Sequence, residues 1–125
     1  MADSTKKLIM LVEDDEFIRE SLTDILEVEG YRVICAANGE EGVNLLRNHE
    51  ELPGLVLLDL MMPVKDGFYF REVQKSDPRI SAIPVVIMSA DGNVEEKQGR
   101  AKAQGYLKKP VEMDEVIFTV KNYAS

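Results

Sequence analysis

The sequence predicts an α/β fold: a doubly wound, five-stranded parallel sheet with helices on both faces. Two observations lead to this prediction. Short unbroken apolar runs, typical of strands that are buried on both faces, recur along the chain. Between them lie longer segments whose apolar residues recur at helical spacing. Strands that alternate with helices of this length form parallel sheets with right-handed crossovers.

The expected elements follow one another in a regular order. Strands are expected at 8–12, 31–35, 55–58, 84–88 and 106–107. Helices are expected around 18–26, 38–48, 68–73, 91–104 and 116–120. Gly30 ends the first helix, and the pair Asn38-Gly39 begins the second.

The fourth helix is expected to be short or loosely packed. Its apolar residues are few, mainly Val94, Ala101 and Ala103. Gly99 lies within it, and a glycine in a helix interior costs about 1 kcal/mol relative to alanine.

Length, charge and cysteine content narrow the class of protein. The chain has 125 residues, the size of one domain, and we expect a single domain over 1–125 with no output domain. The net charge of −8 argues against nucleic-acid binding and favours a cation or a basic protein surface as partner. The single cysteine, Cys35, is expected to be a small buried hydrophobe. With no signal peptide or membrane-spanning run, the chain is expected in the cytoplasm, without membrane association.

Polar residues occur where four of the strands end. Glu13 and Asp14 follow the first strand, Asp59 the third, Ser89 the fourth and Lys109 the fifth. Sites in open α/β sheets form at the carboxyl ends of the strands. We therefore expect three carboxylates, a hydroxyl and an amine to converge at one edge of the sheet.

Three crowded carboxylates favour a bound divalent cation. Repulsion raises their proton affinities, and a hard cation relieves it. Mg²⁺ takes oxygen ligands and commonly uses one or two carboxylates, so Mg²⁺ is expected, with Mn²⁺ as a possible replacement. Zinc would favour His49 or Cys35, which lie away from this edge. A carboxylate beside Mg²⁺, a hydroxyl and a lysine suits phosphoryl transfer through an aspartyl phosphate.

Four short motifs resemble those of the receiver domain of two-component response regulators, a family that includes the single-domain chemotaxis regulators. They are LVEDD at 11–15, LLDLMMP at 57–63 with DG at 66–67, VIMSA at 86–90, and YLKKP at 106–110. Together, in this order and at strand ends, they span nearly all of the chain. The resemblance implies the flavodoxin-like strand order 2-1-3-4-5.

The resemblance also implies roles for the acidic residues. Asp59 would be the phosphoacceptor. Asp14 would be the main metal ligand, with Glu13 helping through water, and Asp59 and the backbone carbonyl of Met61 would complete the protein ligands. Asp15 is expected to be only a helix-start acid.

Further roles concern phosphoryl binding and signalling. Ser89 and Lys109 would bind the phosphoryl group, and Ser89 and Tyr106 would act as the switch, although a half-buried packing role for Tyr106 is an equal alternative. The Lys109-Pro110 bond is expected to be cis. The resemblance also implies that Met61 would lie beside the path of the hydrolytic water, with Asp91 as the other flanking position, and the apolar Met61 then predicts slow dephosphorylation.

The leading hypothesis is a stand-alone receiver that is phosphorylated by a histidine kinase or a phosphotransfer protein and signals to a downstream protein. It would not be an enzyme beyond catalysing its own phosphorylation and dephosphorylation. One alternative is a Mg²⁺-dependent phosphohydrolase that uses an aspartyl phosphate. Such enzymes need an acid two residues after the nucleophile, where this chain has Met61. A second alternative is a binding module that does not use phosphorylation.

Overall fold

The computed structural model describes residues 7–62, 65–90 and 93–124. Its strands are β1 (Leu8–Val12), β2 (Arg32–Ala36), β3 (Leu55–Asp59), β4 (Val85–Ser89) and β5 (Gly105–Lys108). Its helices are α1 (Glu16–Val28), α2 (Gly39–Asn48), α3 (Gly67–Ser76), α4 (Val94–Ala101) and α5 (Met113–Ala124). Every expected element is present, and each predicted strand agrees with the observed one to within one residue at either end.

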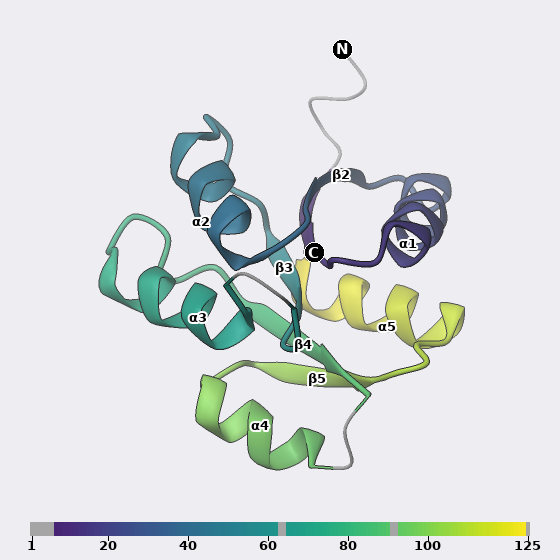
Figure 1. Ribbon diagram of the computed structural model, residues 1–125. Coiled ribbons are helices and arrows are strands. Elements are labelled where there is room, and N and C mark those ends of the chain that lie inside the picture. Colours follow the sequence, from purple (N-terminus) through teal and green to yellow (C-terminus); the bar gives the residue numbers. More distant parts are fainter. Residues whose placement is uncertain (1–6, 63–64, 91–92, 125) are drawn as a thin grey trace.

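The strands form one sheet in the order β2-β1-β3-β4-β5, and every neighbouring pair is parallel. Helices α1 and α5 cover one face, and α2, α3 and α4 cover the other (Figure 1). The predicted fold class and strand order are therefore confirmed.

Alternation along the strands divides the core between the two faces. In β1, Met10 and Val12 pack in the cluster that contains residues of α2, α3 and α4, while Ile9 and Leu11 pack in the cluster that contains residues of α1 and α5. Successive strand side chains point to opposite faces, so a strand covered on both sides must be apolar throughout. This is why the apolar runs were continuous rather than alternating.

Helices α1, α2 and α3 each begin with a side-chain cap. Asp15 accepts from the Ile18 N–H at 3.1 Å, Asn38 from the Glu41 N–H at 2.8 Å, and Asp66 from the Tyr69 N–H at 3.0 Å. Each bond satisfies one of the backbone N–H groups left open at a helix start. The expected role of Asp15 as a helix-start acid is confirmed.

Helix α4 is short, as predicted, and its attachment depends on a residue of α3. The helix has eight residues, of which Val94 and Ala101 are buried. The buried Arg71 donates from Nε to the Ala101 carbonyl at 2.8 Å and from Nη2 to the Lys102 carbonyl at 2.6 Å. A guanidinium from the neighbouring helix thus holds the end of a helix that has little apolar surface of its own.

One expectation about the core is wrong. Cys35 is only half-buried, and its Sγ lies 3.4 Å from Thr23 Oγ1. The reason is position, because β2 is an edge strand and Ala36 is its one fully buried residue.

Within the described part of the chain, no helix combines the length and apolar character needed to span a membrane.

Candidate functional site

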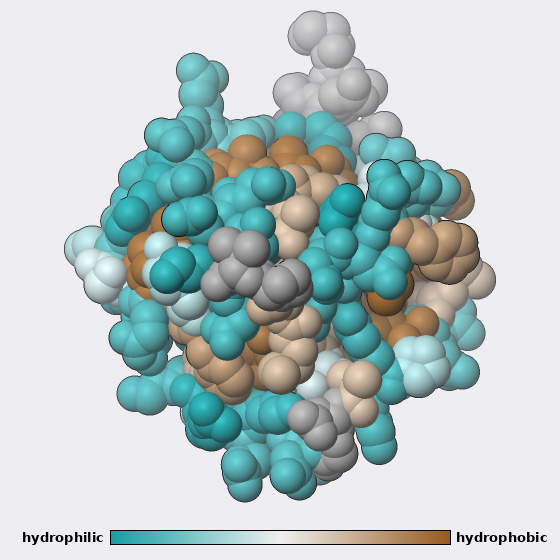
Figure 2. Space-filling view, in the orientation of Figure 1, coloured by the Kyte–Doolittle hydropathy of each residue, from teal (hydrophilic) through white to brown (hydrophobic). Residues whose placement is uncertain are grey.

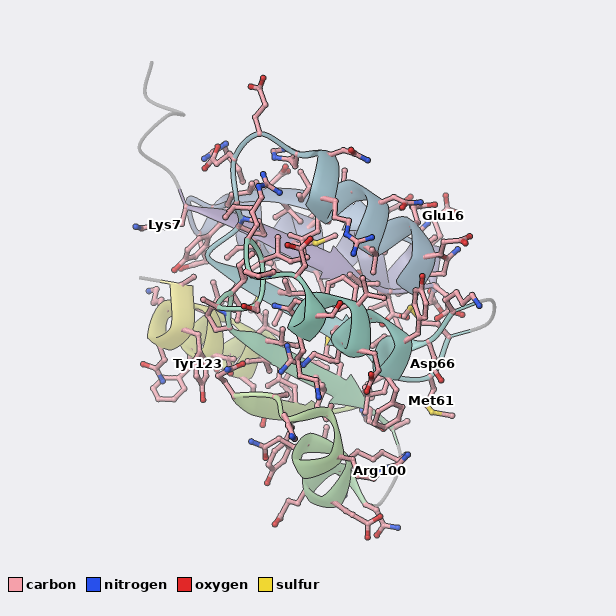
Figure 3. The ribbon with its side chains drawn as sticks, turned by 90° about the vertical axis from the view of Figure 1, so that its left-hand side faces the viewer. Lys7, Glu16, Met61, Asp66, Arg100 and Tyr123 are labelled. Carbon is pink, nitrogen blue, oxygen red and sulfur yellow. The ribbon has the colours of Figure 1, made fainter. Side chains whose placement is uncertain are left out.

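The predicted site residues gather at the carboxyl edge of the sheet. Glu13 follows β1, Asp59 ends β3, Ser89 ends β4 and Lys109 follows β5. Figure 3 shows the start of α1, Met61 and Asp66 at one end of the molecule, opposite the end where Lys7 precedes β1. The convergence expected from the strand ends is therefore observed.

Three carboxylates meet at the centre of this edge. Glu13, Asp14 and Asp59 each present an oxygen within 4.8 Å of the others. The Glu13 and Asp59 side chains are buried, whereas Asp14 is exposed. They line an open cavity of about 420 Å³, together with Asp15, Ile18, Met61, Ala90 and Lys109. The cavity lets a small ligand reach Asp59 from solvent.

Lys109 supplies a cation to the buried acids. Its Nζ lies 2.8 Å from Glu13 Oε1 and 3.3 Å from Asp59 Oδ2. Its backbone N–H donates to the Ser89 carbonyl at 2.8 Å, which continues the β4–β5 pairing past the strand end. The bond to Pro110 is cis, as predicted.

Burial changes the acidity of these groups. Burial raises the pKa of Glu13 to about 7, and the charge of Asp59 adds to this, while Lys109 opposes it. Burial also raises the pKa of Asp59, again opposed mainly by Lys109. Burial tends to lower the pKa of Lys109, but its contacts with the two carboxylates outweigh this and raise it. The acids at this site thus lack full charge compensation from the protein alone.

The donor set fits a hard divalent cation. All three acidic groups offer carboxylate oxygens, which Mg²⁺ prefers. The buried Glu13 Oε1 has the Lys109 ammonium as its ion-pair partner but no well-aligned hydrogen bond. Buried acceptors are normally hydrogen-bonded, so this atom has capacity for a bound water of a hydrated cation.

Met61 and Ser89 lie beside Asp59. The Met61 N–H donates to Asp59 Oδ1 at 3.1 Å, and the Met61 side chain is 60% exposed at the mouth of the cavity. Ser89 is buried at the end of β4, one position beyond Met88, the partner of Asp59 in the β3–β4 register. Metal ligation by the Met61 carbonyl and phosphoryl binding by Ser89 remain predictions.

Tyr106 lies on β5, away from the acidic cavity, and faces α4. Its side chain is exposed, and its hydroxyl donates to Glu95 Oε1 at 3.3 Å. The charge of Glu95 raises the pKa of Tyr106. At 39% exposure, Tyr106 is compatible with either role, and both the switch role and the half-buried packing alternative remain predictions.

The sequence did not point to Arg19 or to the close contact at Gly67. Arg19 Nη1 donates to the carbonyls of Glu13 and Asp14, at 2.8 and 3.1 Å. A Cβ on Gly67 would lie 2.8 Å from the Asp59 carbonyl oxygen, so helix α3 begins against the backbone of the expected phosphoacceptor. An arginine on a helix surface carries no sequence signal for this role, whereas the Asp66-Gly67 pair was already part of a motif.

Similarity to a known family extends over nearly the whole chain. The family model for the response regulator receiver domain matches residues 9–121. This chain belongs to the response regulator receiver family.

Relatives and solved structures agree with this assignment. The chain is 37% identical to the response regulator Rre1 of Synechocystis over 91% of its length, and spans 50% of that protein. It is 32% identical to the polar-differentiation response regulator DivK of Brucella anthropi, over 94% of this chain and 95% of DivK. A response regulator structure from Chloroflexus aurantiacus superposes with a TM-score of 0.87 at 30% identity, over 96% of this chain and 98% of that one.

Membership of the family settles the broad class of function. Receiver domains are signalling domains that accept a phosphoryl group, bind Mg²⁺ at an acidic pocket, and act between histidine kinases and downstream targets. This chain has an acidic cluster, formed by Glu13, Asp14 and Asp59, whose oxygens are close enough together to hold a metal ion. Because receivers are not classical enzymes, the phosphohydrolase alternative loses its support.

Proposed function

We propose that this receiver takes a phosphoryl group onto Asp59 in a Mg²⁺-dependent reaction. The observation that carries the proposal is the position of the Asp59 carboxylate. It lies in the open cavity, 3.3 Å from the Lys109 ammonium and beside the carboxylates of Glu13 and Asp14. The donor would be the phosphohistidine of a histidine kinase or a phosphotransfer protein.

The transfer exchanges one bond to phosphorus for another. An Asp59 carboxylate oxygen forms the P–O bond while the P–N bond of phosphohistidine breaks, and its electron pair stays on the imidazole, which is then protonated. The Met61 N–H orients the acceptor carboxylate through Oδ1. Lys109 stands where it can bind an oxygen of the incoming group, and Ser89, at the end of the adjacent strand, can bind another.

Asp14 and Asp59 would hold Mg²⁺ directly, with Glu13 acting through a bound water and Met61 through its carbonyl. Bound Mg²⁺ supplies charge neutralisation between the anionic acceptor and the anionic phosphoryl group. Mn²⁺ would serve in its place.

The response would reach a partner through α4 and β5. Once Lys109 pairs with a phosphoryl group, its contacts with Glu13 and Asp59 must change. Ser89 and Tyr106 would report the change, because the Tyr106 hydroxyl already contacts Glu95 of α4. We propose that the chain works as a single-domain regulator in the cytoplasm and signals by binding a downstream protein; its near-full coverage of DivK supports this.

The test is labelling by a small phosphodonor. The protein is incubated with acetyl phosphate and Mg²⁺, and the intact mass is measured. We expect the mass of one added phosphoryl group when Mg²⁺ is present. We expect no added mass when a chelator is present from the start, and none in Asp59→Asn. Asp24→Asn, a change of the same kind at an exposed residue of α1, serves as the matched control and should be labelled like the parent. Labelling of Asp59→Asn at the parent's rate would refute the assignment.

A further inference from the structure

Arg19 connects the first helix to the acidic loop. From α1, its Nη1 donates to the backbone carbonyl of Glu13 at 2.8 Å and to that of Asp14 at 3.1 Å. These are consecutive residues, and both contribute carboxylates to the candidate metal site. One guanidinium nitrogen therefore holds the backbone of both acids.

The two Arg19 hydrogen bonds lie where the loop between β1 and α1 leaves the hydrogen bonding of the sheet. The Glu13 N–H still donates to the Ala36 carbonyl of β2 at 3.0 Å, and the chain then leaves the sheet for α1 (Figure 1). Asp15 caps α1, and the Arg19 N–H donates to the Asp15 carbonyl at 2.9 Å. Arg19 is thus fixed by its own helix while its side chain reaches back over the loop. The carbonyls of Glu13 and Asp14 are bonded to Arg19, and the carboxylates of the same two residues lie close to that of Asp59.

Electrostatics gives the contact a second effect. The three carboxylates repel one another, and the Lys109 ammonium contacts Glu13 and Asp59 from one side. Arg19 brings positive charge to Glu13 and Asp14 from the backbone side. Its acidic neighbours Glu16, Glu20 and Asp24 line the same shallow surface pocket, yet its hydrogen bonds go to the loop.

We propose that Arg19 is a positioning residue for the metal site: it holds the loop between β1 and α1 so that Glu13 and Asp14 face Asp59 before the cation arrives. The proposal rests on the proposed function for the use of this site. Outer contacts that orient metal ligands typically change affinity by about 10–100-fold. Arg19 would act in this way through the backbone of two ligands at once.

The experiment is a calorimetric titration of the full chain with MgCl₂. Arg19→Met keeps most of the side-chain length but removes the charge and the donors, and we expect its Mg²⁺ affinity to fall by about tenfold. At saturating Mg²⁺, its labelling by acetyl phosphate should approach the parent rate, because the bound cation itself then holds the acids together. Arg19→Lys retains the charge and should recover part of the affinity.

Arg79→Ala is the matched control. Arg79 also donates to backbone carbonyls, those of Leu46, Arg47 and His49 at 3.0 to 3.4 Å, but at the end of α2. Its loss should leave Mg²⁺ affinity at the parent value, whatever it does to stability. If Arg19→Met binds Mg²⁺ as tightly as the parent, or labels poorly even when saturated, the positioning role is overturned. If Arg19→Met does not fold, Arg19→Gln carries the test, because it also removes the charge and is too short to place one donor between the two carbonyls; parent-like Mg²⁺ affinity in that variant overturns the role equally.

The outcomes separate this inference from the proposed function. A parent protein that is not labelled at Asp59, but whose Mg²⁺ affinity depends on Arg19, would refute the function and support the positioning role. A parent that is labelled at Asp59, with affinity independent of Arg19, would do the reverse.

Discussion

Met61 lies two residues after the expected phosphoacceptor and lines the same cavity. Its backbone is tied to Asp59 by a hydrogen bond of 3.1 Å, while its side chain is mostly exposed and projects from the end of the molecule (Figure 3). A thioether is a weak acceptor and offers no proton. The side chain can therefore cover the acyl phosphate but cannot orient a water for attack. Asp91, the other flanking position, lies outside the described residues.

Replacing Met61 by Asn should therefore speed loss of the phosphoryl group. The amide can hydrogen-bond the attacking water, and it is smaller than the methionine side chain. We expect hydrolysis about tenfold faster, equivalent to about 1.4 kcal/mol of barrier. The measurement is phosphate release from purified phosphoprotein in Mg²⁺. Met61→Leu, which stays apolar, should behave like the parent, and an Asn variant no faster than the parent would contradict the prediction.

Glu13 gives the metal-free protein an unusual dependence on pH. Its pKa rises from 4.5 to about 7, mainly through burial, so the folded state holds a proton that the unfolded state releases. This contribution to the free energy of unfolding is fully present below pH 4.5 and is lost as pH rises through about 7. Urea unfolding in a chelator should show this loss in the parent. Glu13→Gln, which does not titrate, should lack it, and equal pH dependence in both proteins would rule out Glu13 as the source.

The helices differ in how much apolar surface they bury and expose. Figure 2 shows hydrophilic residues over much of one face, with an apolar patch where α1 approaches α5. An apolar groove between α1 and the segment before α5 is lined by Phe17, Ile25 and Val111, among others. Helix α4 differs, because Val94 and Ala101 are its buried residues and its end is held by polar contacts.

Arg71 holds the C-terminal end of α4 through its side-chain hydrogen bonds. Besides its bonds to the end of α4, it donates to Gln74 Oε1 at 2.6 Å, and Gln74 in turn donates to the Ile80 and Ile83 carbonyls, both at 3.0 Å. Arg71→Ala would remove the donor to the Ala101 and Lys102 carbonyls and to Gln74 Oε1. We expect a loss of about 2–4 kcal/mol of unfolding free energy. Relative to the parent, amide hydrogen exchange should become faster in α4 and should change much less in α2. Lys75→Ala, an exposed change on the same helix, should affect neither measurement.

At the scale of the whole molecule, folding and metal binding are linked. The oxygens of Glu13, Asp14 and Asp59 come from two separate strand ends, so they meet only in the folded state. A ligand that binds only the folded state stabilises it, by about 2.7 kcal/mol at a concentration one hundred times its dissociation constant.

We therefore expect Mg²⁺ to raise the unfolding free energy of the parent and to raise that of Asp14→Asn much less. Asp15→Asn is the matched control. It removes the same charge one residue away, and asparagine is as good a helix cap as aspartate. Thermal unfolding with and without Mg²⁺ measures both variants. An equal Mg²⁺ response in Asp14→Asn and the parent would exclude Asp14 as a ligand.

Much of this architecture could be predicted because its signals are local. Buried parallel strands need continuous apolar runs, and the runs at 8–12 and 55–58 are nearly identical to β1 and β3 as observed. The carboxyl ends of parallel strands share one edge, so the convergence of Glu13, Asp59 and Lys109 followed from their places after those runs. The short helix α4 could also be predicted, because its few apolar residues and Gly99 are local features of the sequence.

The remaining features depend on contacts between segments that are distant in the sequence. The 2.8 Å approach of Lys109 to Glu13 depends on the turn after β5. The raised pKa of Glu13 comes mainly from burial by packed elements, and the Lys109 contact opposes it. The contacts of Arg71 with α4 join residues 30 positions apart. The sequence by itself determined which elements form and which chemical groups reach the shared edge, because hydrophobic period and strand polarity are written locally. Only the tertiary structure decided how those groups are held, charged and supported, because side-chain direction and desolvation arise when the elements pack.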